Sequence, residues 1–163
     1  MNRRKAASIL FGILALCWIG VLFFFSGQSG TDSESLSLWT AGKLIQWFPW
    51  IGMTAEAFNP ILRKLAHMGV FAVEGFLLGS SLINAVRPRR GAGISALLCV
   101  GMAAANEYHQ TFSEGRSCQI MDVLIDSSGA LLGIAAAAIL AAFSRAIGAR
   151  RKAGKRNSLG AGD

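Results

Sequence analysis

Four long segments that are mostly apolar divide the chain, and each is as long as a membrane-spanning helix. Residues 6–25 hold no charged side chain, and about 20 apolar residues cross the hydrocarbon core of a bilayer. The other three segments are residues 61–86, 91–110 and 120–143. The pattern therefore predicts an all-α, multi-pass transmembrane bundle of four helices. A cleaved signal peptide is the competing interpretation of the first segment, although its apolar part would normally be only about 7–15 residues long.

The connection between the first two spans predicts an additional helix at the membrane surface. It covers residues 26–59 and has a capping-box spacing that begins at Thr31. Apolar residues then recur at near-helical spacing beside Trp39, Trp47 and Trp50. Because tryptophan concentrates at the headgroup interface, we expect an interfacial helix in this first outer loop. A short helix packed on the spans is the alternative.

In the second and fourth spans, the unusual residues are spaced three or four apart, so that within each span they lie on one face of the helix. Asn59 as N-cap and Pro60 at the first helical position predict the start of the second span. One face of this span then carries Lys64, His67, Phe71 and Glu74 at three- and four-residue spacing. The fourth span has the same kind of spacing at Asp122, Asp126, Gly129 and Gly133. Since small residues let membrane helices approach closely, we expect this face of the fourth span to pack on another helix.

Basic residues gather in three clusters, at residues 1–5, 87–90 and 145–156. These clusters hold twelve of the sixteen Lys and Arg residues, and this segregation is more informative than the net charge of +7. Because positively charged loops stay cytoplasmic, both termini are predicted to be cytoplasmic, and nucleic acid is not an expected partner. The chain then divides into a basic N-terminus, a membrane domain at residues 6–143 and a basic cytoplasmic tail at residues 144–163, which is predicted to be disordered.

The cysteines do not indicate a disulfide framework or a thiolate metal site. Cys17, Cys99 and Cys118 are odd in number and lack the spacing of metal ligands. Neither a phosphate-binding loop nor a nucleophile motif occurs, and no cofactor is expected.

The unusual polar residues of three spans reach one membrane depth in this topology. They lie at the outer ends of the second, third and fourth spans and in the last loop, at Lys64, His67, Glu107, Gln110, Arg116, Asp122 and Asp126. Ionisable side chains within a membrane are costly and usually functional. We therefore expect a polar pocket at the outer membrane face.

The order of these residues resembles the VanZ-like family of bacterial membrane proteins, whose namesake is associated with teicoplanin resistance. The motifs that carry the resemblance are Phe25-Ser26-x-Gln28, Lys64-x-x-His67, Glu107-x-x-Gln110, Gly115-Arg116 and Asp122-x-x-x-Asp126-x-x-Gly129. The family pattern implies Lys64, His67, Glu107, Gln110, Arg116 and Asp122 as its marked positions. Asn106 and Asp126 depart from the pattern, because the family usually has an acid at the first position and Asn at the second. The resemblance implies a bacterial cytoplasmic membrane protein that affects the cell envelope or glycopeptide susceptibility.

Three functions are open for the polar pocket. In a membrane-embedded enzyme, His67, Glu107 and Asp122 would be catalytic, as a general base and its orienting acids. In a binding protein, the pocket would hold membrane lipid, namely a phosphorylated, lipid-linked or peptidoglycan-related ligand of the outer leaflet. The candidate binding residues are Lys64, Gln110, Arg116 and Asp126. In a purely structural role, the same charges would be ion pairs that lock the helix ends together.

A metal site is not expected from the sequence. His67, His109, Glu107 and Asp122 would be the ligands of such a site. However, Glu107 and His109 are two residues apart, which places them about 200° apart around a helix. Both side chains point inward only if the helix has already ended, so His109 is interpreted as an interfacial histidine.

Overall fold

The computed structural model of the chain describes residues 3–27, 30–113 and 118–160, with side chains for all of these except residues 3, 32 and 151–160. The described elements are the helices α1 Arg3–Ser26, α2 Gly30–Trp47, α3 Ala55–Ala85, α4 Pro88–Gln110 and α5 Ile120–Gly160, and the short 3-10 helix η1 Pro49–Ile51. No strand occurs within these ranges. The predicted all-α fold is confirmed, and the helix predicted after Thr31 is α2.

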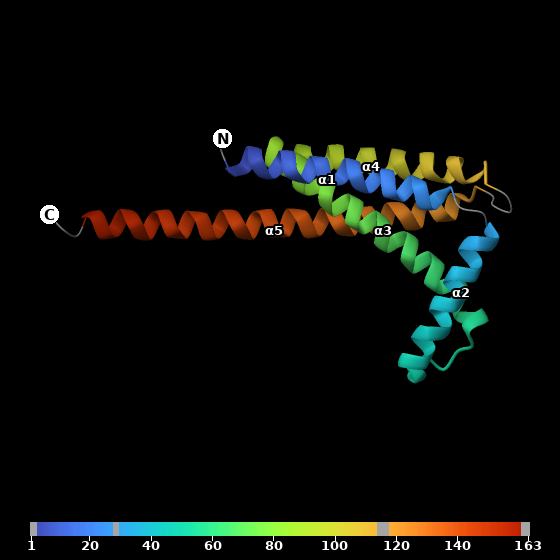
Figure 1. Cartoon of the computed structure of the whole chain (residues 1–163). Helices are drawn as coiled ribbons and strands as arrows, with labels where there is room; N and C mark the ends of the chain where they lie inside the picture. Colours follow the sequence, from blue (N-terminus) through green and yellow to red (C-terminus); the bar gives the residue numbers. More distant parts are fainter. Residues whose placement is uncertain (1–2, 28–29, 114–117, 161–163) are drawn as a thin grey trace.

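Helix α3 is the centre of the bundle. It packs most extensively on α5 and also contacts α1, α4 and α2. Figure 1 shows α1, α4 and α5 running along one another, with α3 crossing them at a slant. The two termini and the turn between α3 and α4 lie toward one end, and α2 leaves the bundle at the other. The end of α4 and the start of α5 share this second end with the start of α2.

Three helices in the described part of the chain are long and apolar enough to cross a membrane. They are Arg4–Ser26, Ala55–Ala85 and Ile120–Arg150. The segment predicted as the third of four spans, residues 91–110, does form a helix, but α4 is not among the three. The composition of α4 explains this, because it begins with two arginines and ends with Asn106, Glu107, His109 and Gln110. The apolar helices support a membrane protein of at least three candidate spans.

The start of α3 differs from the prediction. The N-cap is Thr54, whose hydroxyl accepts a hydrogen bond from the Ala57 amide at 3.3 Å. The helix therefore begins at Ala55 and not at Pro60, which lies inside the helix. The prediction of Asn59 as N-cap is wrong because a proline has helical φ. Pro60 is therefore accommodated near the start of the helix, and Thr54 is the cap.

The basic tail also differs from the prediction. Helix α5 does not end near Phe143 but continues to Gly160. Disorder was expected from the charge of this segment, and that expectation is wrong for residues 144–160. Alanine, arginine and lysine are strong helix formers, and extending an existing helix avoids the cost of a new nucleus.

Small residues bring α3 and α5 into backbone contact. A Cβ atom added at Gly129 would overlap the carbonyl oxygen of Met68, and one added at Gly133 would overlap that of Ala72. The close packing predicted for this face is thus confirmed, and its partner is α3. A buried core lies beside this contact and consists of Leu22, Phe71, Cys99, Ala103, Ala130 and Ile134.

Candidate functional site

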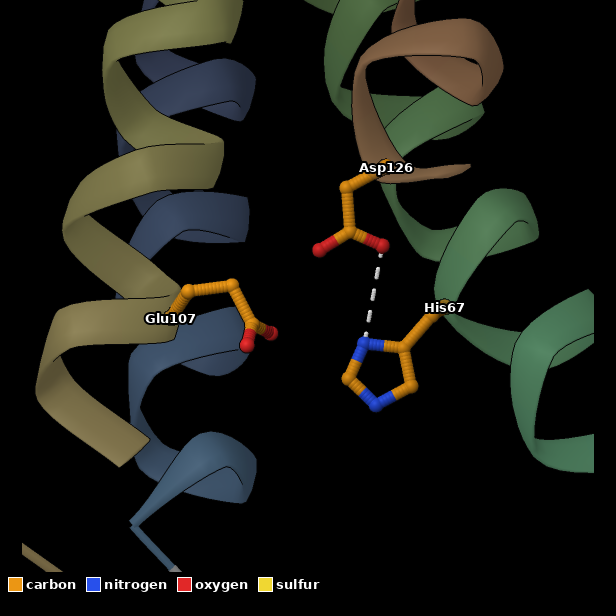
Figure 2. Close-up of side chains that lie close together, drawn as sticks. All are labelled: His67, Glu107 and Asp126. Carbon is orange, nitrogen blue, oxygen red and sulfur yellow. Dashed lines mark ion pairs between the residues drawn. The ribbon is translucent and has the colours of Figure 1, made fainter. Parts of the chain in front are cut away.

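Three ionisable side chains from three helices meet in one cluster. Figure 2 shows His67 of α3, Glu107 of α4 and Asp126 of α5 pointing into the space between their helices. One ligand atom from each lies within 4.8 Å of the other two. The Nδ1 atom of His67 and the Oδ1 atom of Asp126 are 3.6 Å apart and form an ion pair when the imidazole is protonated. We call these three residues the polar cluster.

The glycine contact between α3 and α5 positions two members of the polar cluster. Gly129 meets the backbone at Met68, the residue after His67. Asp126 lies three residues before Gly129, which is about one helical turn. The close approach of the two backbones therefore sets Asp126 beside His67, where a bulkier residue at 129 would push the two helices apart.

Both acids of the polar cluster are buried and poorly satisfied. Asp126 is 0% exposed and Glu107 is 1% exposed. The Oε2 atom of Glu107 accepts a hydrogen bond from the Gln119 amide at 3.3 Å. Its Oε1 atom and both carboxylate oxygens of Asp126 have no hydrogen-bond partner among the described residues. No Lys or Arg in the described ranges forms an ion pair with either acid, so the cluster concentrates negative charge that is costly to bury.

An apolar groove of about 340 Å³ lies beside the polar cluster and shares His67 with it. Residues of α1, α2 and α3 line most of the groove, and α4 adds Asn106. Its polar lining residues are Ser26, Ser33, Ser37, Thr40, Arg63, His67 and Asn106. The Trp18 indole donates a hydrogen bond to the Val70 carbonyl at 3.0 Å, and this bond ties α1 to α3 along the groove. With a 33% exposed side chain, His67 links the groove to the buried acids.

The other sequence-predicted site residues are not all brought to this cluster. Asp122 is half-buried on α5 one turn before Asp126, and both carboxylates act electrostatically on Glu107. Gln110 is buried at the end of α4, and its Nε2 atom has no hydrogen-bond partner within the described ranges. Lys64 is exposed and does not line the groove. Arg116 lies outside the described residues, so its predicted role is untested.

His109 lies between α1 and α4 and is not a member of the polar cluster. Its ring packs edge-on against Phe23 with the ring centroids 5.5 Å apart. Glu107 and His109 thus point to different sides of α4, as their two-residue separation predicted. Among the described residues, the group able to hold a metal ion is His67, Glu107 and Asp126, so Asp126 takes the place that the sequence argument gave to Asp122.

Two residues that line the groove, Arg63 and Asn106, were not among the predicted site residues. Arg63 lines the groove, whereas its neighbour Lys64 was chosen because it shares a helical spacing with His67. Asn106 was noted only as a departure from the family pattern, and it proves to be buried and to line the groove. Asn106 could have been identified as a site residue from its position, because it begins the polar end of an otherwise apolar helix.

Comparison with known proteins identifies one family. The sequence profile of the VanZ/LLP1 family matches residues 11–141. This range includes the polar cluster and every described helix except the start of α1 and the end of α5. Neither the curated proteins nor the solved structures include a significant match. Because the profile covers most of the chain, the protein is a member of the VanZ/LLP1 family.

Proposed function

We propose that this VanZ/LLP1 family membrane protein binds a lipid-linked component of the bacterial cell envelope and thereby alters susceptibility to teicoplanin-type glycopeptides. The observation that carries the proposal is the junction at His67 between an apolar groove and a buried polar cluster. Ligand sites in proteins are mostly apolar cavities of about 300–1,000 Å³ with a few polar groups that orient the ligand. The groove has this size and this distribution of polarity.

The proposed membrane arrangement has four spans, with the groove at the outer face and both termini in the cytoplasm. It includes α4 as a span, since α4 lies alongside α1 and α5. Three exposed tryptophans at one end of the molecule, Trp39, Trp47 and Trp50, support a place for α2 and η1 in the outer headgroup layer. The turn between α3 and α4 holds Arg87, Arg89 and Arg90 and lies toward the same end of the molecule as the two termini (Figure 1). These arginines support a cytoplasmic position for that end.

The proposed ligand has an apolar chain and a phosphorylated or peptide-bearing head. Trp18, Leu22 and Leu36 would contact the chain along the groove. Arg63 lies on the groove wall and would pair with a phosphate or carboxylate of the head. Arg63 therefore replaces Lys64 as the first basic residue to test, because Lys64 does not line the groove.

A second candidate function is catalysis on such a lipid-linked precursor. The observation that favours it is the 3.6 Å approach of Asp126 to the Nδ1 atom of His67. A carboxylate at Nδ1 fixes the imidazole tautomer and leaves Nε2 as the basic atom. His67 would then act as the general base and Asp126 as the residue that orients it. The same geometry also suits a protein that binds the lipid-linked ligand without converting it.

Reporter fusions test the membrane arrangement. An enzyme reporter that is active only outside the cytoplasm should be active when fused after Pro49 and inactive when fused after Arg90, since Pro49 follows α2 and Arg90 lies in the first turn of α4. A cytoplasmic reporter should give the opposite pattern. The reverse result would move the groove to the cytoplasmic face and contradict the proposed ligand.

Substitutions in the polar cluster test the functional proposal. We expect His67→Ala and Glu107→Gln to return teicoplanin susceptibility to that of the host with an empty vector, while membrane levels stay within about twofold of wild type. The reason is that both residues serve the ligand. The side chain of His67 is partly exposed, and Glu107→Gln keeps the size of a buried side chain while it removes a charge that is costly to bury. Glu56→Gln is the control, because Glu56 is an exposed acid at the start of the same helix.

Immunoblots of the membrane fraction separate a functional role from a structural one in this experiment. Loss of the protein from the membrane would support ion pairs that only lock the helix ends. Analysis of the lipids of the same strains separates catalysis from binding, because turnover changes the lipid inventory and binding does not.

A further inference from the structure

We propose that His67, Glu107 and Asp126 bind one divalent transition-metal ion of the zinc type. These residues offer one imidazole nitrogen and two carboxylates, and their ligand atoms lie within 4.8 Å of one another. Zinc binds such atoms at about 2.0–2.2 Å, so two ligands of a tetrahedral site lie about 3.3–3.6 Å apart. The 3.6 Å separation of His67 Nδ1 and Asp126 Oδ1 already has this value.

The burial of the two acids supports a cation at this place. Three of their four carboxylate oxygens have no hydrogen-bond partner among the described residues. No Lys or Arg among these residues forms an ion pair with either acid. Asp122 adds negative charge close to Glu107. Buried charges are normally paired or coordinate metals. A divalent cation would neutralise both carboxylates at once, which the single imidazole of His67 cannot do.

The groove gives the proposed ion a route of entry and a free coordination position. His67 lines the groove and is partly exposed, whereas the two acids are fully buried. Three protein ligands with one open position are typical of metal sites that act on a bound molecule. An ion here would also allow a phosphate to approach an acidic cluster. This last step rests on the proposed function, while the metal site itself does not.

The proposed site differs from the zinc set that the sequence made conceivable. That set joined Glu107 to His109 on one helix, and the helical rotation between them argued against it. Here each ligand comes from a different helix, and the third ligand is Asp126. Asp126 reaches His67 only because Gly129 lets α5 approach the backbone of α3.

Metal analysis of the purified full-length protein tests the site. After removal of metals with EDTA, addition of one equivalent of zinc and desalting, wild type should retain about one zinc per chain. The variants Glu107→Gln and Asp126→Asn should retain at least about tenfold less, because each loses a charged ligand. The matched control is Glu74→Gln, which changes a fully buried acid on α3 outside the proposed site. Glu74 lies seven residues, or roughly 10 Å, along the helix from His67. This variant should keep the wild-type zinc content.

A second measurement on wild type keeps the test decisive if the variants fail to fold. Cobalt added to the metal-free protein should give visible absorption bands that zinc abolishes. The variant His67→Cys should add a thiolate-to-cobalt charge-transfer band. A zinc content at background with no cobalt bands would overturn the proposal, as would zinc retained by both acid variants. Because the readout is metal content and not lipid binding, the metal site and the proposed function can fail separately.

Discussion

Gly133→Ala is expected to destabilise the protein strongly, although it adds a single methyl group. The new Cβ atom would overlap the carbonyl oxygen of Ala72 and lie 2.7 Å from the amide nitrogen of Phe76. Both are backbone atoms of α3 and cannot rotate away as a side chain would. Overpacking of this kind costs about 1–3 kcal/mol and sometimes more. The measurement is the thermal unfolding midpoint in detergent, followed by size-exclusion chromatography of the protein that remains folded.

The matched control for this substitution is Gly101→Ala on α4. No atom lies within 4 Å of a Cβ added at Gly101. Alanine is favoured over glycine in a helix interior by about 1 kcal/mol, so this variant should be as stable as wild type or more stable. The same chemical change is thus expected to destabilise the protein at Gly133 and not at Gly101. Equal effects at both positions would contradict the close contact between α3 and α5.

Ala66→Trp is expected to abolish the effect on glycopeptide susceptibility while the protein still accumulates in the membrane. Ala66 is exposed and lines the groove directly before His67. An indole at this position would occupy the apolar space that the proposed lipid chain needs. Because Ala66 is not part of the buried core, the fold should tolerate the larger side chain. We expect ligand affinity to fall by at least about tenfold, which corresponds to about 1.4 kcal/mol.

Leu65→Trp is the control for the groove substitution. Leu65 is the preceding residue, is 50% exposed and does not line the groove. It therefore receives the same side chain in the same helix and membrane region, and its activity should match wild type. If both variants lose activity, the tryptophan acts through the membrane or the fold, and the groove is not the ligand site.

The periodicity of the chain predicted the helices well because apolar segments of spanning length are a strong signal. Helix ends were less predictable. At α3, Thr54 is the cap in place of Asn59, since several residues can cap a helix and their competition depends on the preceding chain. At α5, the helix outlasts its apolar segment, because charge alone does not end a helix whose residues favour it.

The polar cluster was predictable in part. We could predict that His67 and Glu107 lie at a similar depth in the membrane by counting residues along each span. The pairing of His67 with Asp126 could not be predicted, because it depends on how α5 is rotated against α3, which the contacts of Gly129 determine. The preference for Lys64 over Arg63 has a related cause. Adjacent residues of a helix differ by about 100° in direction, and the sequence does not show which of them faces the groove.

The groove itself was not predictable. It requires α2 to pack on α3, so that Leu36 and Thr40 form one wall. Nothing in the periodicity of α2 states which helices it faces. The tryptophans of α2 indicate in the sequence that this helix lies at the membrane interface. Its place in the wall of the groove has no such signal in the sequence.

Mass spectrometry of the lipids that purify with the protein tests the central proposal most directly. Wild type, Ala66→Trp and Leu65→Trp would be purified in the same detergent from the same host, and their lipids compared with those of the whole membrane. We predict that a phosphorylated, lipid-linked envelope species is enriched with wild type and with Leu65→Trp, and is at least about tenfold less abundant with Ala66→Trp. The same lipid inventory for all three proteins, without enrichment over the membrane, would contradict a ligand site in the groove.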